Sequence, residues 1–314
     1  MGGRANSRPH CGMKSWFLLL AGILVNAGAR AAAPETIPLW PEGVPGLKAG
    51  AAAEQIVNQR ITAVHYPSLL RFAPPPGAGC GTAVIFCPGG GYTHLTIAPD
   101  GGEETRTLNA AGVTVFILKY RMVEYGYPAP LQDVLRAIRL VRSQAAAWGV
   151  RPDRIGLLGE SAGGHLAACA ATLWDDPDGR TGAPLDAVSA RPDFVALVYP
   201  VVTMKPPFVH QGSREALLGR NPPTALIEKL SIETRVRPDM PPVFLVATMA
   251  DKTVPVENSL HLYQALRAAG VPSELHVYAQ GSHGNSLDPR YGATAFWPQR
   301  LLDWMRCNGW LTAP

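Results

Sequence analysis

The chain has 314 residues, of which 47% are hydrophobic and 17% charged, a balance typical of a protein with a large buried core. The net charge is +4, and the lysines and arginines are scattered along the sequence rather than clustered, which argues against nucleic acid as a partner. The length suits one α/β domain.

The N-terminal residues predict an export signal. Lys14 precedes an apolar run from Trp16 to Val25, and small residues then follow at the spacing that a signal peptidase accepts. The run is too short to cross a bilayer as a helix of the mature chain. We therefore expect residues 1–33 to be a signal peptide cleaved near residues 31–33. The mature chain, residues 34–314, is expected to be periplasmic or extracellular, without membrane insertion.

A regular alternation of strands and helices begins at Thr82. Before it, residues 61–74 are predicted to form an antiparallel strand pair between Pro- and Gly-rich stretches. We predict later strands near residues 82–87, 113–120, 154–159, 194–200, 242–248 and 274–279, and helices near residues 102–112, 131–149, 162–174, 256–270 and 295–307. These strands are mostly apolar on both faces, which is typical of a largely parallel sheet with helices on both sides. The predicted fold class is α/β, in a single domain.

Residues 202–237 interrupt this alternation. They are rich in proline and polar residues and contain a helical pattern near residues 213–219. We predict a small insertion here, at a place where such folds often carry a lid.

A serine motif lies between a predicted strand and a predicted helix. Residues 159–163 read Gly-Glu-Ser-Ala-Gly, and the strand–turn–helix context is the one in which a G-x-S-x-G pattern marks a nucleophile. The sharp turn strains the serine backbone, and Gly159 and Gly163 leave room where side chains would collide. The serine hydroxyl then stands at the N-terminus of the following helix. We predict Ser161 as a nucleophile rather than a small turn residue.

A serine nucleophile needs a base, and the base needs an orienting acid. His283 lies in a glycine-flanked loop after the last strand, whereas His276 lies within that strand and His165 on an earlier helix. Asp251 follows the carboxyl end of a strand, where catalytic groups gather in open α/β sheets. We predict His283 as the base and Asp251 as the acid. Glu257 is the alternative acid, but a favourable charge in the first turn of a helix explains it better.

The glycine-rich stretch Pro-Gly-Gly-Gly-Tyr follows the first core strand. Glycines allow backbone N–H groups to face a substrate carbonyl without an intervening Cβ atom. We therefore predict an oxyanion hole built from the N–H groups of Gly90, Gly91 and Ala162. A phosphate-binding loop is the alternative, but the stretch has neither the G-x-G-x-x-G spacing nor a following lysine.

Four cysteines remain in the predicted mature chain: Cys80, Cys87, Cys169 and Cys307. None of their spacings resembles a metal-ligand pattern, so we expect no metal and no other cofactor. One disulfide and buried free thiols are both compatible with the sequence.

These motifs resemble the α/β-hydrolase superfamily. Within it, the chain is similar to esterases related to bacterial acetylxylan esterases and to the hormone-sensitive-lipase group, the BD-FAE-like carboxylesterases. The resemblance rests on LWPEGVPG, PGGGY, LKYRM, YPAPLQDVLRAIRLVRS, PDRIGLLGESAGGHLAA, DKTVPVENS and GSHG, in this order. The order serine, aspartate, histidine is that of the α/β-hydrolases. Pro88 stands where the lipase-like branch has histidine, which favours the acetylxylan-esterase-like branch, and Ala250 stands where relatives often carry a second aspartate.

The resemblance implies an exported serine carboxylesterase that acts through an acyl-enzyme. Its expected substrates are small esters or acetylated polysaccharides such as xylan. No long amphipathic helices precede the first core strand, which favours short acyl chains, and Tyr92 and His94 are candidate substrate-binding residues. The alternatives are a peptidase resembling the prolyl oligopeptidases, a lipase-like esterase, and a hydrolase fold that only binds its ligand.

Overall fold

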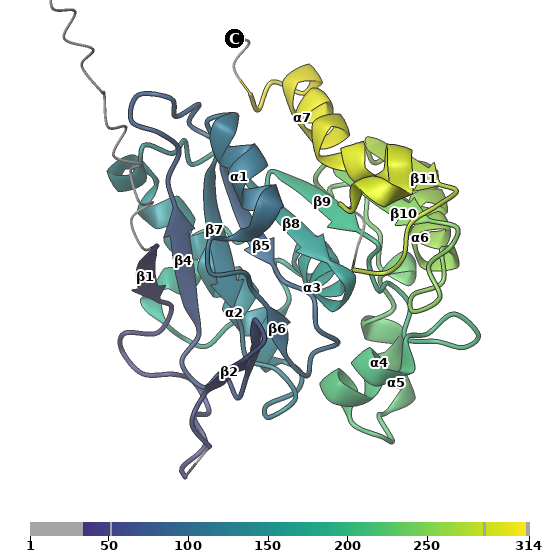
Figure 1. The fold of residues 1–314 in the computed structure, drawn as a ribbon. Helices are drawn as coiled ribbons and strands as arrows, with labels where there is room; N and C mark the ends of the chain where they lie inside the picture. The colour runs from purple at the N-terminus through teal and green to yellow at the C-terminus, as the bar shows by residue number, and fades with distance from the viewer. Residues whose placement is uncertain (1–33, 51, 285–286, 312–314) are drawn as a thin grey trace, which may run out of the picture. The chain divides into compact units, whose positions relative to one another are not determined.

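An eight-stranded sheet forms the centre of the fold (Figure 1). The computed structural model describes residues 34–50, 52–284 and 287–311, so the predicted signal peptide lies outside the described residues. In order across the sheet, the strands are β1 (Glu35–Pro38), β4 (Ser68–Phe72), β7 (Thr114–Lys119), β5 (Ala83–Cys87), β8 (Ile155–Glu160), β9 (Phe194–Val198), β10 (Val243–Thr248) and β11 (Ser273–Tyr278). The strands from β7 across to β11 run parallel, and β4 pairs antiparallel with β1 and β7. The predicted, mostly parallel sheet is therefore confirmed.

A second, three-stranded sheet lies beside the first. It consists of β2 (Gln55–Val57), β3 (Arg60–Thr62) and β6 (Leu95–Thr96), all antiparallel. The predicted pairing within residues 61–74 is wrong, because β3 and β4 are strands of different sheets. The strand pattern was correct, but the pairing partners come from more distant parts of the chain, which local sequence does not specify.

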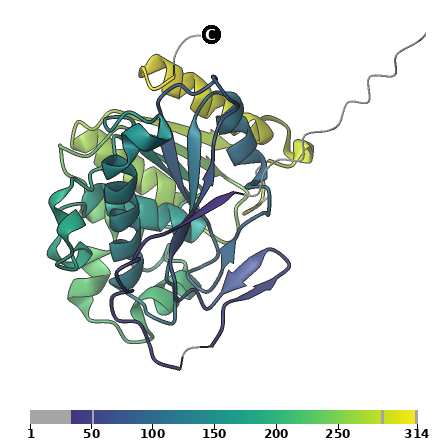
Figure 2. The same ribbon diagram turned by 90° about the vertical axis from the view of Figure 1, so that its left-hand side faces the viewer.

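Helices cover both faces of the large sheet (Figure 2). They are α1 (Gly102–Ala110), α2 (Ala129–Ser143), α3 (Ser161–Thr172), α4 (Gln211–Leu218), α5 (Thr224–Lys229), α6 (Glu257–Ala268) and α7 (Trp297–Cys307). Helices α1 and α7 pack together on one face, and α2 and α3 pack together on the other. Gly112 and Gly270 have φ angles of 85° and 73° just after α1 and α6, so both glycines end a helix in the left-handed region as predicted.

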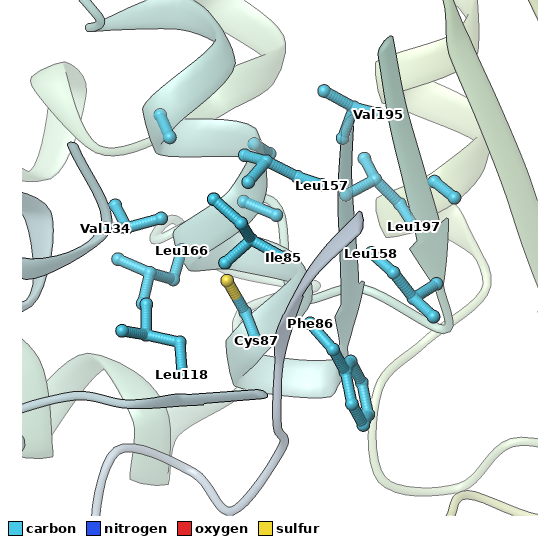
Figure 3. Close-up of a cluster of buried hydrophobic side chains, with 14 of the residues drawn as sticks. Ile85, Phe86, Cys87, Leu118, Val134, Leu157, Leu158, Leu166, Val195 and Leu197 are labelled. Atoms are coloured by element: carbon cyan, nitrogen blue, oxygen red, sulfur yellow. The ribbon is translucent and has the colours of Figure 1, made fainter. Parts of the chain in front are cut away.

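The core lies between the sheet and its helices (Figure 3). Strands β5, β9 and β10 are buried along their whole length, as expected for parallel strands with helices on both faces. Every residue of α3 is buried, and its many alanines and glycines allow it to approach the sheet closely. A Cβ atom at Gly164 would lie 2.8 Å from the Cβ of Pro200, so this approach requires glycine. Helix α3 is thereby fixed against the centre of the sheet.

The order of the strands creates a natural ligand site. After β5 the chain continues to β7 on one side of it, and later returns to β8 on the other side. Loops that leave the carboxyl ends of β5 and β8 therefore diverge and leave a crevice, which is where open α/β sheets bind their ligands. Ser161 and the glycine-rich stretch both lie at this edge of the sheet.

Candidate active site

Ser161 stands at the sharp turn between β8 and α3. Its φ angle is 54°, in the left-handed region that non-glycine residues rarely adopt, so the turn holds the serine in a strained conformation. A Cβ atom at Gly163 would lie 2.1 Å from the carbonyl oxygen of Cys87, and one at Gly159 would lie 2.4 Å from the carbonyl oxygen of Gly163. Both glycines of the motif are therefore required by close backbone approach, as the sequence predicts.

The structure brings Ser161, His283 and Asp251 into one hydrogen-bonded chain. His283 Nε2 lies 2.8 Å from Ser161 Oγ, and His283 Nδ1 lies 2.7 Å from Asp251 Oδ2. The carboxylate accepts from Nδ1–H, which leaves the Nε2 lone pair free to accept the serine proton. Glu257, the alternative acid, lies in the first turn of α6, as expected from its sequence position.

Asp251 is held as a carboxylate. Its partial burial acts to raise the pKa of the carboxyl, but hydrogen bonds from His283 and from the N–H groups of Val254 and Thr253 outweigh burial and lower that pKa below its usual value. Asp251 Oδ1 accepts both backbone bonds, at 2.8 Å from Thr253 and 3.0 Å from Val254. The side chain is thus oriented by its own loop, with Oδ2 left for the imidazole.

The glycine-rich loop lies directly against the nucleophile. A Cβ atom at Gly89 would lie 3.2 Å from the Cβ of Ser161, and Gly90 and Gly91 have φ angles of 139° and 63°. Within the described residues, no hydrogen bond uses the N–H group of Gly90 or Gly91. The N–H group of Ala162 is in the first turn of α3, where an intrahelical acceptor is lacking. These three donors are therefore available to an oxyanion.

Two buried tyrosines hold the glycine-rich loop through hydrogen bonds. The Tyr120 hydroxyl donates to the carbonyl oxygen of Pro88 at 2.7 Å. The Tyr92 hydroxyl donates to Nδ1 of His165 at 2.8 Å, since the Nε2–H group of His165 donates to the carbonyl oxygen of Leu230. Burial lowers the pKa of His165 to about 4, so this imidazole is neutral and Nδ1 can accept.

The interpretation of Tyr92 as a substrate-binding residue is wrong. Its side chain is 0% exposed and points into the core rather than into the cavity beside Ser161. The physical reason is its φ angle of 60°, which turns the chain so that the ring packs beneath the loop. His94, the other candidate, does line the cavity. Burial and the nearby Arg60 lower the pKa of His94 below its usual value.

A cavity of about 520 Å³ opens beside Ser161. Each described residue that lines it is either a glycine or carries a polar side chain. The lining consists of Arg60, Gly89, Gly90, Gly91, Thr93, His94, Thr96, Glu160, Ser161, Tyr199, His210, Gly212, Thr253, His283 and Gly284. Such a lining offers hydrogen-bond donors and acceptors to a hydroxyl-rich ligand, alongside carbon surface of similar extent.

The cavity contains residues that the sequence did not single out. His210 and Gly212 come from the predicted insertion, which holds α4 and α5 between β9 and β10. His210 Nδ1 lies 2.7 Å from Ser213 Oγ, which fixes the imidazole beside the glycine-rich loop. Burial and the neighbouring His283 lower the pKa of His210, whereas Asp251 opposes this shift.

Tyr199 also lines the cavity and was not predicted. It follows β9 directly, and this position at the carboxyl end of a strand could have marked it as a candidate site residue.

The described cysteines form no disulfide. Cys80, Cys87, Cys169 and Cys307 are all free, and Cys87 and Cys169 are buried. Burial raises the pKa of both buried thiols, which makes them unreactive. No three His, Cys, Asp or Glu side chains in the described part of the chain are grouped to hold a metal ion.

No helix is long and apolar enough to cross a membrane within the described residues, 34–50, 52–284 and 287–311.

Residues 72–266 match the family described as BD-FAE. An acetylxylan esterase from Xylanibacter ruminicola is 33% identical over 208 residues, which are 65% of this chain and 41% of that protein. An endo-1,4-beta-xylanase B from Butyrivibrio fibrisolvens is 33% identical over 205 residues, which are 64% of this chain and 32% of that protein. The matches therefore span less than half the length of these two curated relatives.

Solved structures show the same architecture. An acetyl ester-xyloside bifunctional hydrolase from Caldicellulosiruptor lactoaceticus superposes with a TM-score of 0.79 at 36% identity, covering 90% of this chain and 100% of that one. The carboxylesterase Cest-2923 from Lactobacillus plantarum superposes with a TM-score of 0.65 at 25% identity, covering 83% of this chain and 99% of that one. The predicted α/β-hydrolase fold is confirmed by these likenesses and by the strand order.

Proposed function

The chain belongs to the BD-FAE family of α/β-hydrolase fold, and we propose that it is an exported serine carboxylesterase that removes short acyl groups, chiefly acetyl, from polysaccharides such as xylan. The observation that carries the proposal is the hydrogen-bonded series of Ser161, His283 and Asp251, of which the serine and the histidine line the cavity.

The geometry supports a two-step acyl transfer. Ser161 Oγ attacks the ester carbonyl carbon while His283 Nε2 takes the serine proton, and Asp251 stabilises the resulting imidazolium. The N–H groups of Gly90, Gly91 and Ala162 bind the developing oxyanion. The imidazolium then protonates the departing alcohol, which leaves an acetyl ester on Ser161. Water, deprotonated by His283, attacks this ester, and collapse of the second tetrahedral intermediate releases acetate and restores the serine hydroxyl.

The cavity supports a short acyl group and a hydrophilic alcohol. The threonine, histidine and arginine side chains of the lining offer hydrogen-bond partners to sugar hydroxyls, and the carbon surface between them can contact the C–H faces of a sugar ring. A long hydrocarbon chain would cover these polar groups without replacing their hydrogen bonds to water.

The polysaccharide part of the proposal is supported by the relatives. One is named an acetylxylan esterase, one a xylanase, and one solved structure an acetyl ester-xyloside hydrolase. The export part is supported by the order of Lys14, the apolar run from Trp16 to Val25 and the small residues after it. Edman sequencing of protein recovered outside the cytoplasm tests export, with a new N-terminus expected near residue 34.

Acetate release tests the activity. The mature protein is incubated with acetylated xylan, p-nitrophenyl acetate and p-nitrophenyl octanoate, with Ser161→Ala as the control. We expect release from xylan and from the acetate ester, both abolished in Ser161→Ala. A preference for octanoate would indicate the lipase-like alternative. Cleavage of a prolyl peptide in place of esters would indicate the peptidase alternative, and xylan binding without any serine-dependent turnover would indicate a binding module.

A further inference from the structure

Tyr199 packs against the predicted catalytic base. Its ring centroid lies 4.7 Å from that of His283, with an angle of 57° between the ring planes. The residue follows β9 directly and has a φ angle of 36°, an uncommon conformation for a side chain of this size. The strained backbone brings the ring to the wall of the cavity, next to the imidazole.

Tyr199 lies close to a pair of carboxyl groups. Glu160, the residue before the nucleophile, and Glu104 of α1 line one cavity together with Tyr199. Glu160 and Tyr199 line both the cavity beside Ser161 and this second cavity, which has a volume of about 260 Å³. The pair therefore connects α1 to the elements that carry the serine and the tyrosine.

The surroundings disfavour the charged form of both carboxyl groups. Burial, followed by the charge of Glu104, raises the pKa of Glu160 well above its usual value, although the bond from Tyr199 opposes this. Burial also raises the pKa of Glu104. A protonated Glu160 can donate to Glu104 with one oxygen and accept from Tyr199 with the other. This arrangement fixes the tyrosine hydroxyl without placing a second full charge beside the active site.

We propose that Tyr199 is a positioning residue for His283, and that the Glu104–Glu160 carboxyl pair locks it in place. The proposal rests on the proposed function, in which His283 becomes an imidazolium in each half of the reaction. A cation within about 6 Å of an aromatic ring centroid is stabilised by the ring. The ring therefore restricts rotation of the imidazole and stabilises its charged form, whereas the hydroxyl serves to anchor the ring.

The test separates the ring from the hydroxyl. Tyr199→Phe keeps the ring and Tyr199→Leu removes it, and the pH dependence of kcat/KM is measured with p-nitrophenyl acetate. We expect Tyr199→Phe to stay within about threefold of the wild type, and Tyr199→Leu to lose about tenfold. The acid limb of the profile should move about one pH unit lower in Tyr199→Leu alone, because the protonated imidazole loses its aromatic neighbour.

A second pair of variants tests the carboxyl lock. Glu160→Gln can still accept from Tyr199 and donate to Glu104, so it should lose less kcat than Glu160→Leu, which can do neither. The loss in Glu160→Leu should match that of Tyr199→Phe, because both variants remove the anchor of the ring. Glu35→Gln, at an exposed position of the edge strand β1, is the control and should change nothing.

One measurement does not depend on turnover. In a Ser161→Ala background, NMR measures how fast the Nδ1 proton of His283, which is hydrogen-bonded to Asp251, exchanges with solvent. This exchange should be faster in Tyr199→Leu than in Tyr199→Phe. Equal losses in the two Tyr199 variants, or a folded Tyr199→Leu protein with wild-type kinetics and exchange, would overturn the proposal. A wild-type protein without Ser161-dependent turnover would overturn the proposed function instead, and the exchange measurement would still decide whether Tyr199 positions His283.

Discussion

The Nε2 atom of His283 lies 2.8 Å from the Oγ atom of Ser161, although 122 positions separate the two residues in the chain. Helix α3 begins at the serine, and the loop after β11 carries the histidine. The parallel sheet brings both to one edge, because the carboxyl ends of its parallel strands lie on the same side. Chemistry at the serine therefore depends on a contact that only the folded chain makes.

Replacing Ser161 with alanine should abolish ester hydrolysis. The serine oxygen is the only heavy atom removed, so the fold should persist. We expect kcat to fall by about 10⁴-fold or more. Steady-state kinetics with p-nitrophenyl acetate and a circular dichroism spectrum check both parts. Residual turnover within tenfold of the wild type would show that another group performs the attack.

Replacing Asp251 with asparagine should lower kcat by about 10³- to 10⁴-fold with little change in KM. The amide would still accept from the Thr253 and Val254 N–H groups through its oxygen, but its NH₂ group would face His283 and favour the wrong tautomer. Glu257→Gln is the matched control and should keep wild-type kinetics. The reverse ranking of the two variants would identify Glu257 as the acid.

Gly90→Ala should disable the oxyanion loop. A Cβ atom there would lie 1.9 Å from the carbonyl oxygen of His94, so the loop must move and the donors move with it. We expect kcat to fall by about 10²-fold or more, the loss seen when one oxyanion donor is removed. Gly43 has a similar φ of 122° but open space around it, so Gly43→Ala is a control that has the backbone strain without the clash. Unchanged kinetics in Gly90→Ala would exclude the loop from catalysis.

Glu160→Gln should make the stability of the protein less dependent on pH. A carboxyl whose pKa is raised by folding keeps a proton that the unfolded chain has released, so the free energy of unfolding falls as pH rises from the unfolded value of about 4.3 towards the folded pKa. Glutamine does not titrate, so the free energy of unfolding of the variant should not fall in this way. It should exceed that of the wild type at pH 8, and the difference between the two proteins should become smaller towards pH 4. Urea denaturation at pH 4, 6 and 8 measures it, and a constant difference would mean that Glu160 does not hold a proton.

Tyr92→Phe should weaken the fold without affecting substrate binding. The variant leaves Nδ1 of buried His165 without its donor, which costs about 1–3 kcal/mol of unfolding free energy. KM for p-nitrophenyl acetate should stay within about twofold of the wild-type value. A raised KM at unchanged stability would contradict the buried position of this hydroxyl.

Much of the site could be predicted because its parts are encoded locally. The G-x-S-x-G motif requires close backbone packing on both sides of Ser161, and only glycine satisfies it, so the pattern is visible in five residues. The strands and helices followed from apolar runs and periodicity. The glycine-flanked loop of His283 and the place of Asp251 after the end of a strand then predicted the base and the acid.

Tyr92 and the strand pairing show where local reasoning failed. An aromatic residue beside a glycine-rich loop can face either a cavity or the core, and here a positive φ turns Tyr92 inward to His165, which is 73 positions away. Likewise, β3 and β4 were recognised as strands, but their partners lie in β2, β6, β1 and β7. Both decisions depend on contacts between segments that are distant in the chain.

The sequence by itself therefore determined the α/β class, the strained serine turn and the candidate residues, because these depend on side-chain periodicity and on local backbone sterics. Only the tertiary structure decided which polar groups meet in the cavity. It brought Tyr199 to His283 and Glu104 to Glu160. The physical reason is that a parallel sheet aligns the ends of strands from all along the chain, and the depth and burial of each side chain follow from that packing.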